Sequence, residues 1–507
     1  MAKETSIYPL NIPAIEVNED LDFLLLELPP RFKPLLPHGL GYVNNILKST
    51  GISFQTLDVN IICYHRYHSK RLLVGNNPVI LSNSIKMREE PWDESDTSEW
   101  HKEEVVDYFW PHLEEVIQEI IKKRPKSVGI SSNCNNRFIA FKFINAIRES
   151  VPEILFIAGG YDCIHNENSK HLLHFYDYVV IGEAEMTLPF LVTALAQNEK
   201  PKDVPGVISR FDTPGRAAAI PLPPHDLDLY GFPQYEWLDT ELYRNFTGER
   251  HAVISSSRGC NWRRCRYCND KLIFRKRSPA KVAAEIEFWV KKGFRLIQFN
   301  DSDINGDYTA LYELCSEIIK RKLNVKLLGQ QRVDKHNTRE FFQHLAKAGF
   351  FHLSFGVDGW SDHILRLQGK GYNMKQVFQN LRDCYESGIH VIASAVVGVP
   401  GETDDDVAET IANFIKCKNY ITLIGTLRPL ELLPGSIYFQ NQAKYKISFL
   451  GDKEQIIRDY PINIPNDLWF SEEPYIDKKI RFERVDHITR VLLENGLPFS
   501  HFLKSNF

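Results

Sequence analysis

The segment that decides the fold is "SSSRGCNWRRCRYCND", residues 255–270, which places Cys260, Cys265 and Cys268 within nine positions. The other six of the chain's nine cysteines lie apart from this group. A structural zinc site needs four ligands, and only three cysteines are close in sequence here. Three thiolates on a four-iron cluster leave one iron open to another ligand, whereas electron-transfer clusters are held by four cysteines. The spacing therefore favours a reactive iron–sulfur centre.

Strand-like segments surround the cysteines at regular intervals. The cysteine segment directly follows one such run, and the complete set is 251–257, 295–301, 325–331, 351–358, 390–400 and 422–429. Stretches long enough for helices separate these runs, which is the pattern of a parallel barrel with its active face at the carboxyl ends of the strands. We therefore predict a partial (β/α)6 TIM-type barrel that carries the cysteines on this face.

The N-terminal part shows a second alternation of strands and helices. Its apolar runs are 22–28, 127–132, 154–160 and 178–183, and amphipathic helices are expected over 112–123 and 138–149. This pattern predicts an α/β fold with a parallel, Rossmann-like sheet covered by helices. Open sheets of this kind bind ligands at the carboxyl ends of their strands.

These patterns divide the chain into four parts. Residues 201–250 are rich in proline and have little periodicity, so they are interpreted as a linker. The predicted parts are a Rossmann-like domain over 1–200, the linker over 201–250, the barrel over 251–440 and a C-terminal extension of unknown role over 441–507.

Composition narrows the class of protein. The chain is 43% hydrophobic and 25% charged with a net charge of -4, which is typical of a globular protein and does not favour nucleic acid as a partner. The start, MAKETSIYPL, lacks the pattern of a signal peptide, and no run of 18 or more apolar residues predicts a membrane span. Scattered cysteines without a disulfide pattern indicate a reducing compartment, so we expect a cytoplasmic protein without a membrane partner.

The segment 250–440 resembles the radical S-adenosylmethionine (radical SAM) superfamily. The family signature is C-x3-C-x2-C with an aromatic residue before the last cysteine, and Tyr267 holds that place here. This chain has C-x4-C-x2-C, because four residues separate Cys260 from Cys265. The resemblance implies that Cys260, Cys265 and Cys268 hold a four-iron four-sulfur (4Fe-4S) cluster, and that S-adenosylmethionine binds at the open iron and is cleaved to a radical.

Later segments extend the resemblance to the S-adenosylmethionine contacts. They are "NDSDIN" (300–305), "QQRVD" (330–334), "SFGVDG" (354–359) and "VVGVPGET" (396–403), with "LRPLELLPGS" (427–436) resembling the sixth strand. Asp358 stands where relatives often have glutamate, and Ser436 replaces a threonine. The cosubstrate contacts implied by this resemblance are Tyr267, Asn300, Asp301, Asp303, Arg332, Ser354, Asp358, Val397 and Gly398.

The N-terminal half resembles the cobalamin-binding domain that precedes many radical SAM barrels. The matching segments are 35–60, 127–133, 154–162, 176–191, 204–210 and 227–235. The motif Asp-x-His-x-x-Gly is absent, since no histidine stands two places after Asp58, so cobalamin would bind without a protein histidine on cobalt. The residues implied to line the groove for the nucleotide tail of cobalamin are Ser131, Ser132, Gly159, Gly160, Gly182 and Glu183. The alternative is a sheet that has lost its cofactor and only supports the barrel.

These resemblances lead to one principal function and three alternatives. The principal prediction is a cobalamin-dependent radical SAM methyltransferase acting at an unactivated centre of a small molecule or peptide. A radical cyclisation or rearrangement without methyl transfer would use the same cofactors, and a non-enzyme alternative is a zinc-binding or redox-sensing protein. A methylthiotransferase is disfavoured, because Cys63, Cys134 and Cys163 lack the spacing of a second cluster.

The residues around the cysteines are basic. An acidic reducing partner such as flavodoxin or ferredoxin is expected to dock on this stretch, although charge balance for the anionic cluster explains it equally well. The basic residues are Arg258, Arg263, Arg264, Arg266, Lys271, Arg275, Lys276 and Arg277.

Overall fold

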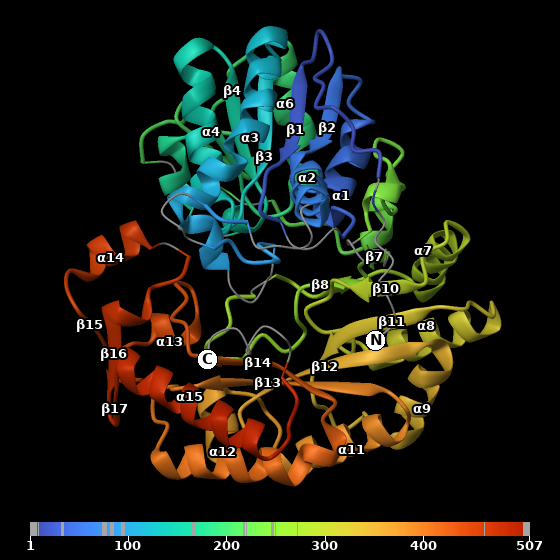
Figure 1. The fold of residues 1–507 in the computed structure, drawn as a ribbon, viewed down its shortest axis with the longest axis vertical. Helices are drawn as coiled ribbons and strands as arrows, with labels where there is room; N and C mark the ends of the chain where they lie inside the picture. The colour runs from blue at the N-terminus through green and yellow to red at the C-terminus, as the bar shows by residue number, and fades with distance from the viewer. Residues whose placement is uncertain are drawn as a thin grey trace. The chain divides into compact units, whose positions relative to one another are not determined.

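The computed structural model describes residues 8–499 apart from 9, 32–34, 74–78, 82–85, 93–96, 165–168, 216–218, 220, 245–247, 249, 271 and 461. The chain forms two compact units (Figure 1). Unit 1 is Met1–Pro224 with Leu229–His251, and unit 2 is His225–Asp228 with Ala252–Phe507.

Unit 1 is built on one six-stranded sheet with the strand order β2-β1-β3-β4-β5-β6. The first five strands are parallel, and β6 runs antiparallel to β5. The strands are β1 (Phe23–Glu27), β2 (Phe54–Asp58), β3 (Ser127–Ser131), β4 (Leu155–Gly159), β5 (Tyr178–Val180) and β6 (Val207–Ser209). The α-helices are α1 (His38–Leu47), α2 (Val59–Leu73), α3 (Glu103–Lys123), α4 (Arg137–Ser150) and α6 (Leu188–Ala196).

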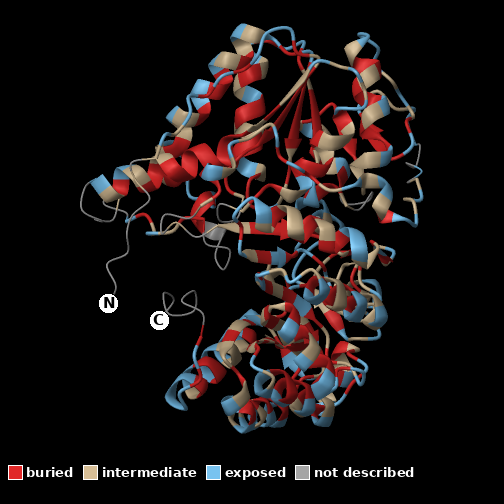
Figure 2. Cartoon of the chain, turned by 90° about the vertical axis from the view of Figure 1, so that its right-hand side faces the viewer, coloured by how far each residue is buried: buried red, intermediate tan, exposed pale blue. Residues whose placement is uncertain are grey.

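The strands of unit 1 are buried because helices cover both faces of the sheet (Figures 1 and 2). Phe23 and Leu25 of β1 pack in one apolar cluster with residues of α1 and α6, whereas Leu24 and Leu26 point to the opposite face. The helices α2, α3 and α4 lie side by side and cover that opposite face. The run FLLLE is therefore apolar without alternation, as a strand buried on both faces requires.

The strand order places a topological switch between β1 and β3. The chain passes from β1 to β2 on one side and then returns to β3 on the other side of β1. In doubly wound sheets with the order 2-1-3-4-5, ligands bind outside the carboxyl ends of the strands at this switch. The carboxyl ends of β1 and β3 are Glu27 and Ser131.

Unit 2 contains a six-stranded sheet with the order β14-β13-β12-β11-β10-β7, and the pairs from β10 to β14 are parallel. This confirms the predicted α/β fold class with a Rossmann-like domain followed by a partial (β/α)6 barrel. The strands are β7 (His251–Ile254), β10 (Leu296–Phe299), β11 (Lys326–Gln331), β12 (Phe350–Asp358), β13 (His390–Val397) and β14 (Leu423–Pro429). The helices between them are α7 (Pro279–Lys291), α8 (Tyr308–Lys320), α9 (Arg339–Ala348), α10 (Asp362–Gln368), α11 (Met374–Glu386) and α12 (Asp404–Cys417).

The barrel sheet has an outer face against its helices and an opposite, inner face. Phe355 of β12 contacts Phe342 of α9, with 6.1 Å between ring centroids, so it lies on the outer face. Because side chains alternate along a strand, Ser354 and Gly356 lie on the inner face. Buried Ala393 and Ala395 alternate in the same way with half-buried residues of β13. Figure 1 shows the helices α9, α11 and α12 on the outer side of this sheet.

The structure differs from the predicted boundaries at two places. β6 lies within the segment interpreted as a linker, because its backbone extends the unit 1 sheet beside β5. The C-terminal extension belongs to unit 2 and carries its own three-stranded sheet. The short helix α13 (Ile437–Gln440) precedes the extension, whose elements are β15 (Ile447–Phe449), α14 (Lys453–Asp459), β16 (Trp469–Glu472), β17 (Tyr475–Ile476) and α15 (Lys478–Glu494). Within the described ranges, no helix has the length and apolar character that crossing a membrane would need.

Candidate functional site

The three cysteines lie in a loop whose two ends are held together. The short strand β8 (Ser257–Arg258) precedes the loop and pairs antiparallel with β9 (Arg275–Lys276), which follows it. Gly259 begins the loop at φ +76, and a Cβ there would stand 2.5 Å from the Leu272 carbonyl oxygen. Only glycine meets both conditions. The two ends of the cysteine loop are therefore held side by side just after the end of β7.

Asp301 holds the strand that leads into the cysteine loop. Its buried carboxylate accepts hydrogen bonds from the Ser256 backbone nitrogen at 3.0 Å, from Ser256 Oγ at 2.7 Å and from Ser257 Oγ. Asp301 was predicted as a cosubstrate contact. In the structure its acceptor capacity serves the backbone beneath the cysteines.

A segment from the end of α10, Leu367–Tyr372, grips the other side of the cysteine loop, and we call it the clamp segment. Arg266 donates its backbone N–H to Gln368 O and its Nη1 to Leu367 O, both at 2.9 Å, and Trp262 donates to Gly369 O at 2.9 Å. Gly371 has φ +77, and a Cβ on it would lie 2.1 Å from the Trp262 ring. The clamp segment, "LQGKGY", was not singled out from the sequence. Its signal is two glycines flanking a lysine after a helix.

Asp358 connects the cysteine loop to the clamp segment and to β13. Its carboxylate accepts hydrogen bonds from Tyr267 OH at 2.5 Å, from Ser394 Oγ at 2.6 Å and from Lys370 Nζ. Burial alone would raise the pKa of Asp358, but the Lys370 ammonium and the hydrogen bonds together lower it. The structure thus brings the predicted pair Tyr267 and Asp358 together, and adds Lys370 and Ser394, which sequence reasoning missed.

The thiols fit the predicted cluster in donor type and surroundings. Burial raises the pKa of Cys265 and raises that of Cys268 to about 11, and each of these thiols lies within electrostatic reach of the others and of Cys260. The positive charges of Lys370 and Arg332 also act on Cys265 and favour its thiolate form. The Asp270 backbone N–H donates to Cys268 Sγ at 3.3 Å, as ligand sulfurs of iron–sulfur clusters commonly accept.

Within the described ranges, no three His, Cys, Asp or Glu side chains gather tightly enough to bind a single metal ion.

Of the other predicted cosubstrate contacts, Arg332 also contacts the cysteine loop. Its guanidinium stacks on Trp262, 4.1 Å from the ring centroid, and donates to Lys370 O. Its backbone N–H reaches Asp303, whose pKa burial raises to about 6. Asn300 is exposed beyond β10, and Ser354 is half-buried on the inner face of β12.

Val397 and Gly398 lie at the end of β13, against the C-terminal extension. The Gly398 N–H donates to both Glu402 carboxylate oxygens at 2.9 Å, and the Gly398 carbonyl accepts from Arg481 Nε at 3.2 Å. Arg481 is fully buried and stacks 3.4 Å from the centroid of Trp469. The polar backbone groups of Gly398 are thus occupied by the protein itself, and the C-terminal extension fixes this strand end.

The predicted cobalamin residues lie along the carboxyl edge of unit 1, but they differ in availability. Ser131 is half-buried at the end of β3, and a Cβ on the neighbouring Gly159 would meet nothing within 4 Å. Ser132 is buried and donates to Asp162 at 2.9 Å, and Gly160 packs against its backbone. The open side of Gly159 is the feature here that fits close approach of a nucleotide tail.

The remaining two residues, Gly182 and Glu183, follow β5. Gly182 adopts φ +75 and donates its N–H to Cys163 O at 2.8 Å, and both residues are half-buried. Asp162, which anchors this turn region, is paired with Arg137 at 2.9 Å. No local sequence pattern predicts this ion pair.

The switch between β1 and β3 carries a buried ionisable group that sequence reasoning also missed. Asp58 accepts from Tyr243 OH at 2.8 Å and from Arg31 at 3.4 Å, while Glu27 lies 3.9 Å from the same guanidinium. Burial raises the pKa of Glu27 to about 8 despite the Arg31 charge. Asn136 spans the switch by donating to Ser131 O at 2.8 Å and Leu28 O at 3.3 Å.

The basic stretch separates into paired and exposed residues. Arg277 is buried in an ion pair with Glu285, and Lys276 pairs with Asp307. Arg263 and Arg264 are exposed on the cysteine loop. Lys271 lies outside the described residues.

Comparison with known proteins identifies the class of unit 2. Residues 254–414 match the profile of the Radical SAM superfamily. The chain therefore contains a radical SAM domain, and the predicted resemblance is confirmed for the barrel.

Individual relatives and a solved structure extend the comparison. The chain is 26% identical over 305 residues to "Uncharacterized methyltransferase PH0819" of Pyrococcus horikoshii, covering 58% of this chain and 65% of that protein. It is 24% identical over 311 residues to the anaerobic magnesium-protoporphyrin IX monomethyl ester cyclase of Synechocystis, covering 59% and 62%. The chain thus spans less than two thirds of the length of these relatives.

The fold resembles that of the radical S-adenosylmethionine methyltransferase TsrM from Kitasatospora setae. The TM-score is 0.60 with 18% identity, over 85% of this chain and 79% of that chain. TsrM has been solved with cobalamin and a [4Fe-4S] cluster bound. This likeness shows that the chain shares the fold of TsrM.

Proposed function

We propose that this protein is a cobalamin-dependent radical SAM methyltransferase that acts on an unactivated centre of a small molecule or peptide. The observation that carries the proposal is the cysteine loop with its three thiols, held between β7 and the clamp segment at the carboxyl end of the barrel. The relative named as a methyltransferase and the fold shared with TsrM support the same assignment.

In the proposed enzyme, Cys260, Cys265 and Cys268 hold a 4Fe-4S cluster. The cluster, when bound, supplies the electron that cleaves S-adenosylmethionine, and cobalamin supplies a carrier for the methyl group. The protein's part is to position these groups and exclude water, since the difficult chemistry belongs to the cofactors. Lys370 and Arg332 oppose the negative charge of the thiolates, and Tyr267 is fixed by Asp358 beside them.

Cobalamin is proposed to bind at the carboxyl edge of unit 1. The switch between β1 and β3 and the open side of Gly159 support this location. No histidine follows Asp58 at the expected spacing, and Asp58 is engaged with Tyr243 and Arg31. The proposed cobalamin therefore has no cobalt ligand from that motif.

Radical cyclisation is the second candidate, because a relative of similar identity is named as a cyclase. Both candidates need a small reducing partner such as flavodoxin or ferredoxin, for which the exposed Arg263 and Arg264 are proposed contacts. Both also suit a cytoplasmic protein, where thiols stay reduced until they bind metal.

The test begins with anaerobic purification and reconstitution of the full chain with iron, sulfide and cobalamin. We expect about four irons per chain and an electron paramagnetic resonance signal of the reduced cluster that changes when S-adenosylmethionine is added. A zinc-containing colourless protein, or a cluster signal insensitive to S-adenosylmethionine, contradicts the radical SAM assignment.

Product analysis then separates the two enzyme candidates. Methyl transfer through cobalamin yields S-adenosylhomocysteine together with 5′-deoxyadenosine, whereas cyclisation without methyl transfer yields 5′-deoxyadenosine alone. Detection of 5′-deoxyadenosine without S-adenosylhomocysteine during substrate turnover excludes the methyltransferase proposal and retains the cyclase.

A further inference from the structure

The inner face of the barrel sheet carries one cation whose partner is missing from the described residues. This residue is Arg428, near the carboxyl end of β14. In the β13–β14 pair, Ser394 is in register with Thr426, and Val396 is in register with Arg428. Ser394 Oγ reaches the Asp358 carboxylate at 2.6 Å, so its side chain lies on the inner face. Residues in register on parallel strands point to the same face, and Arg428 therefore shares that face with Asp358.

The other charged groups of this region are already satisfied. Asp358 is paired with Lys370, and Arg332 stacks on Trp262 and lies in the field of Asp303. Arg428 is exposed and makes no side-chain hydrogen bond, ion pair or ring contact with any residue that the structure describes. The charge of its guanidinium is thus left over on a face where the neighbouring charges are matched.

Two uncharged polar side chains on the neighbouring strands also lack hydrogen-bond partners within the described residues. Gln330 of β11 and Ser354 of β12 are in register with each other, and neither makes a side-chain hydrogen bond within the described part of the chain. The inner face therefore presents a guanidinium together with an amide and a hydroxyl. A molecule bound on this face would displace water from the Arg428 guanidinium. The free-energy cost of that desolvation is offset only if the molecule carries a negative charge.

The amino-acid head group of S-adenosylmethionine is not the natural partner of Arg428. The predicted contacts Asn300, Asp301, Asp303 and Arg332 lie at β10 and β11, whereas β14 is the opposite edge of the sheet. Ser354 and Asp358 are predicted contacts on β12, and Asp358 is engaged with Lys370. Val397 and Gly398, at the end of β13 beside β14, offer only backbone groups, and those of Gly398 are occupied by Glu402 and Arg481. Four strand spacings separate β10 from β14, which is roughly 19 Å along the sheet at about 4.8 Å each. The free guanidinium is thus available to the second reactant.

We propose that Arg428 binds an oxyanion, a carboxylate or a phosphate group, of the substrate. The planar guanidinium offers two parallel N–H donors that match either group. This assignment rests on the proposed function, because it takes the inner face of the barrel as the place where the substrate is held. It narrows the substrate class to acidic small molecules, or peptides with an acidic group near the reacting centre.

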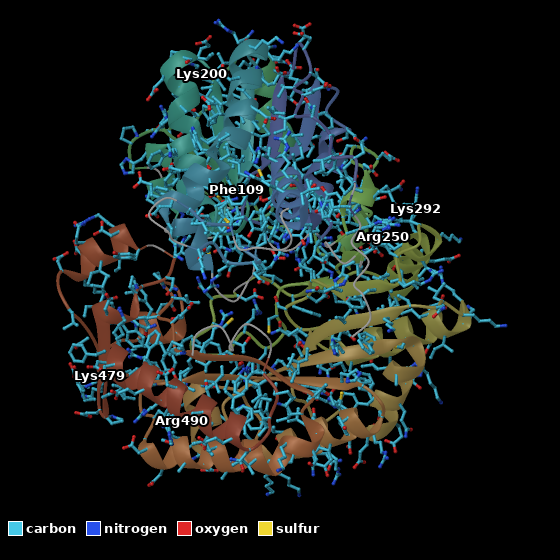
Figure 3. All side chains as sticks on the ribbon, viewed as in Figure 1. Phe109, Lys200, Arg250, Lys292, Lys479 and Arg490 are labelled. Atoms are coloured by element: carbon cyan, nitrogen blue, oxygen red, sulfur yellow. The ribbon has the colours of Figure 1, made fainter. Side chains whose placement is uncertain are left out.

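The test is site-resolved labelling of the reconstituted protein with phenylglyoxal, which modifies free guanidinium groups, followed by peptide mass spectrometry. Labelling is measured at constant ionic strength with acetate, inorganic phosphate or neutral acetamide as the probe. Arg490 on α15, which is exposed and labelled in Figure 3, is the matched control. We expect acetate or phosphate at millimolar concentration to slow modification of Arg428 at least threefold, while acetamide has no effect and Arg490 is unchanged. The stronger of the two anions indicates whether the substrate carries a carboxylate or a phosphate.

Three results overturn the proposal. They are slower labelling of Arg428 than of Arg490 without any probe, equal protection by acetamide, or equal protection of Arg490. The cluster signal with S-adenosylmethionine is recorded separately for wild type and Arg428→Gln. Loss of the cosubstrate response in wild type contradicts the proposed function, whereas failure of anion protection with that response intact contradicts only the role of Arg428.

Discussion

Each unit has a carboxylate largely withdrawn from solvent at the carboxyl edge of its sheet, and the two differ in protonation. In unit 2, Asp358 has Lys370, Tyr267 and Ser394 in hydrogen-bond contact, so its pKa is lowered despite burial. In unit 1, Glu27 lies 3.9 Å from an Arg31 that it shares with Asp58, and burial raises its pKa to about 8. The charge states differ because Asp358, with 15% of its side chain exposed, has a cation in direct contact, whereas the buried Glu27 has none.

The surrounding polar atoms do not share this contrast. Near Glu27, the buried atoms Glu27 Oε1, Arg31 Nε and Asn60 Nδ2 lack hydrogen-bond partners within the described residues. Around the cysteine loop, the same holds for Asn269 Oδ1, Gln368 Oε1 and Arg332 Nε. The two edges therefore differ in the charge that faces the carboxylate, and not in how completely their polar atoms are satisfied.

The largest expected effect comes from removing a cysteine of the loop. Cys265→Ala should reduce iron from about four atoms per chain to fewer than one, because two thiolates do not hold the cluster. Cleavage of S-adenosylmethionine should fall below detection. Cys134→Ala is the control, since that cysteine is exposed and lies in unit 1. Full iron content in Cys265→Ala, measured by chemical analysis, would refute the ligand assignment.

The next effect tests the ion pair that sets the charge of Asp358. Lys370→Met should destabilise unit 2 by about 3–5 kcal/mol, because it leaves a buried carboxylate without its cation. The double variant Lys370→Met/Asp358→Asn should recover a large part of this loss. Both are measured by calorimetric unfolding of the apoprotein. Additive losses in the double variant would mean that the two residues act independently.

The clamp segment can be tested with two glycines that share a backbone conformation. Gly371 has φ +77 and lies against the Trp262 ring, whereas Gly388 has φ +83 and open space around its Cβ position. Both alanine substitutions carry the backbone cost of roughly 1 kcal/mol, but only Gly371→Ala displaces Trp262. We expect Gly371→Ala to lose about 2 kcal/mol more and to reduce the yield of reconstituted cluster. Equal free energies of unfolding of the two variants in chemical denaturation would show that the clamp segment accommodates the added methyl group without loss of stability.

Only part of the site at the cysteine loop could be predicted from the sequence. The cysteine spacing, Tyr267 and the strand ends of the barrel are local patterns, and they located the cysteine loop and its neighbour Asp358. Lys370 and Ser394 were missed, because their roles depend on contacts with Asp358 across the sheet and the clamp segment.

In unit 1 the sequence patterns predicted even less of the candidate site. The four predicted strands and their glycine-rich ends were recovered, but Glu27 reads in sequence as the polar end of the apolar run FLLLE. Its burial follows from β2 and β3 flanking β1, which no local pattern reveals. Likewise β6 was hidden in a proline-rich stretch, since a strand of three residues has too little periodicity to recognise.

A smaller effect is expected for cobalamin at the edge of unit 1. Gly159→Val adds a side chain on the side of Gly159 where nothing lies within 4 Å. The fold should tolerate it, while cobalamin affinity should fall about tenfold, or about 1.4 kcal/mol. Ultraviolet–visible titration with cobalamin measures the affinity, and circular dichroism checks the fold. Unchanged cobalamin affinity with an intact fold would show that the nucleotide tail does not bind beside β4.

The last prediction isolates the protonation of Glu27. The folded protein keeps this proton up to about pH 8, whereas the unfolded chain releases it near the ordinary value of 4.5. Between these values the folded state binds more protons than the unfolded state, so Glu27 makes stability fall as pH rises.

Glu27→Gln removes this dependence, because glutamine keeps the shape of the neutral acid. The variant should match wild type at pH 4.5 and become progressively more stable than wild type as the pH rises toward 8, seen as a higher unfolding temperature of the cobalamin-free protein. Glu199→Gln, an exposed substitution in the same unit, should show no such divergence. If Glu27→Gln is instead less stable at pH 8, the carboxylate is charged there. The ion pair with Arg31 would then outweigh burial, as Lys370 does for Asp358, and the contrast between the two edges would disappear.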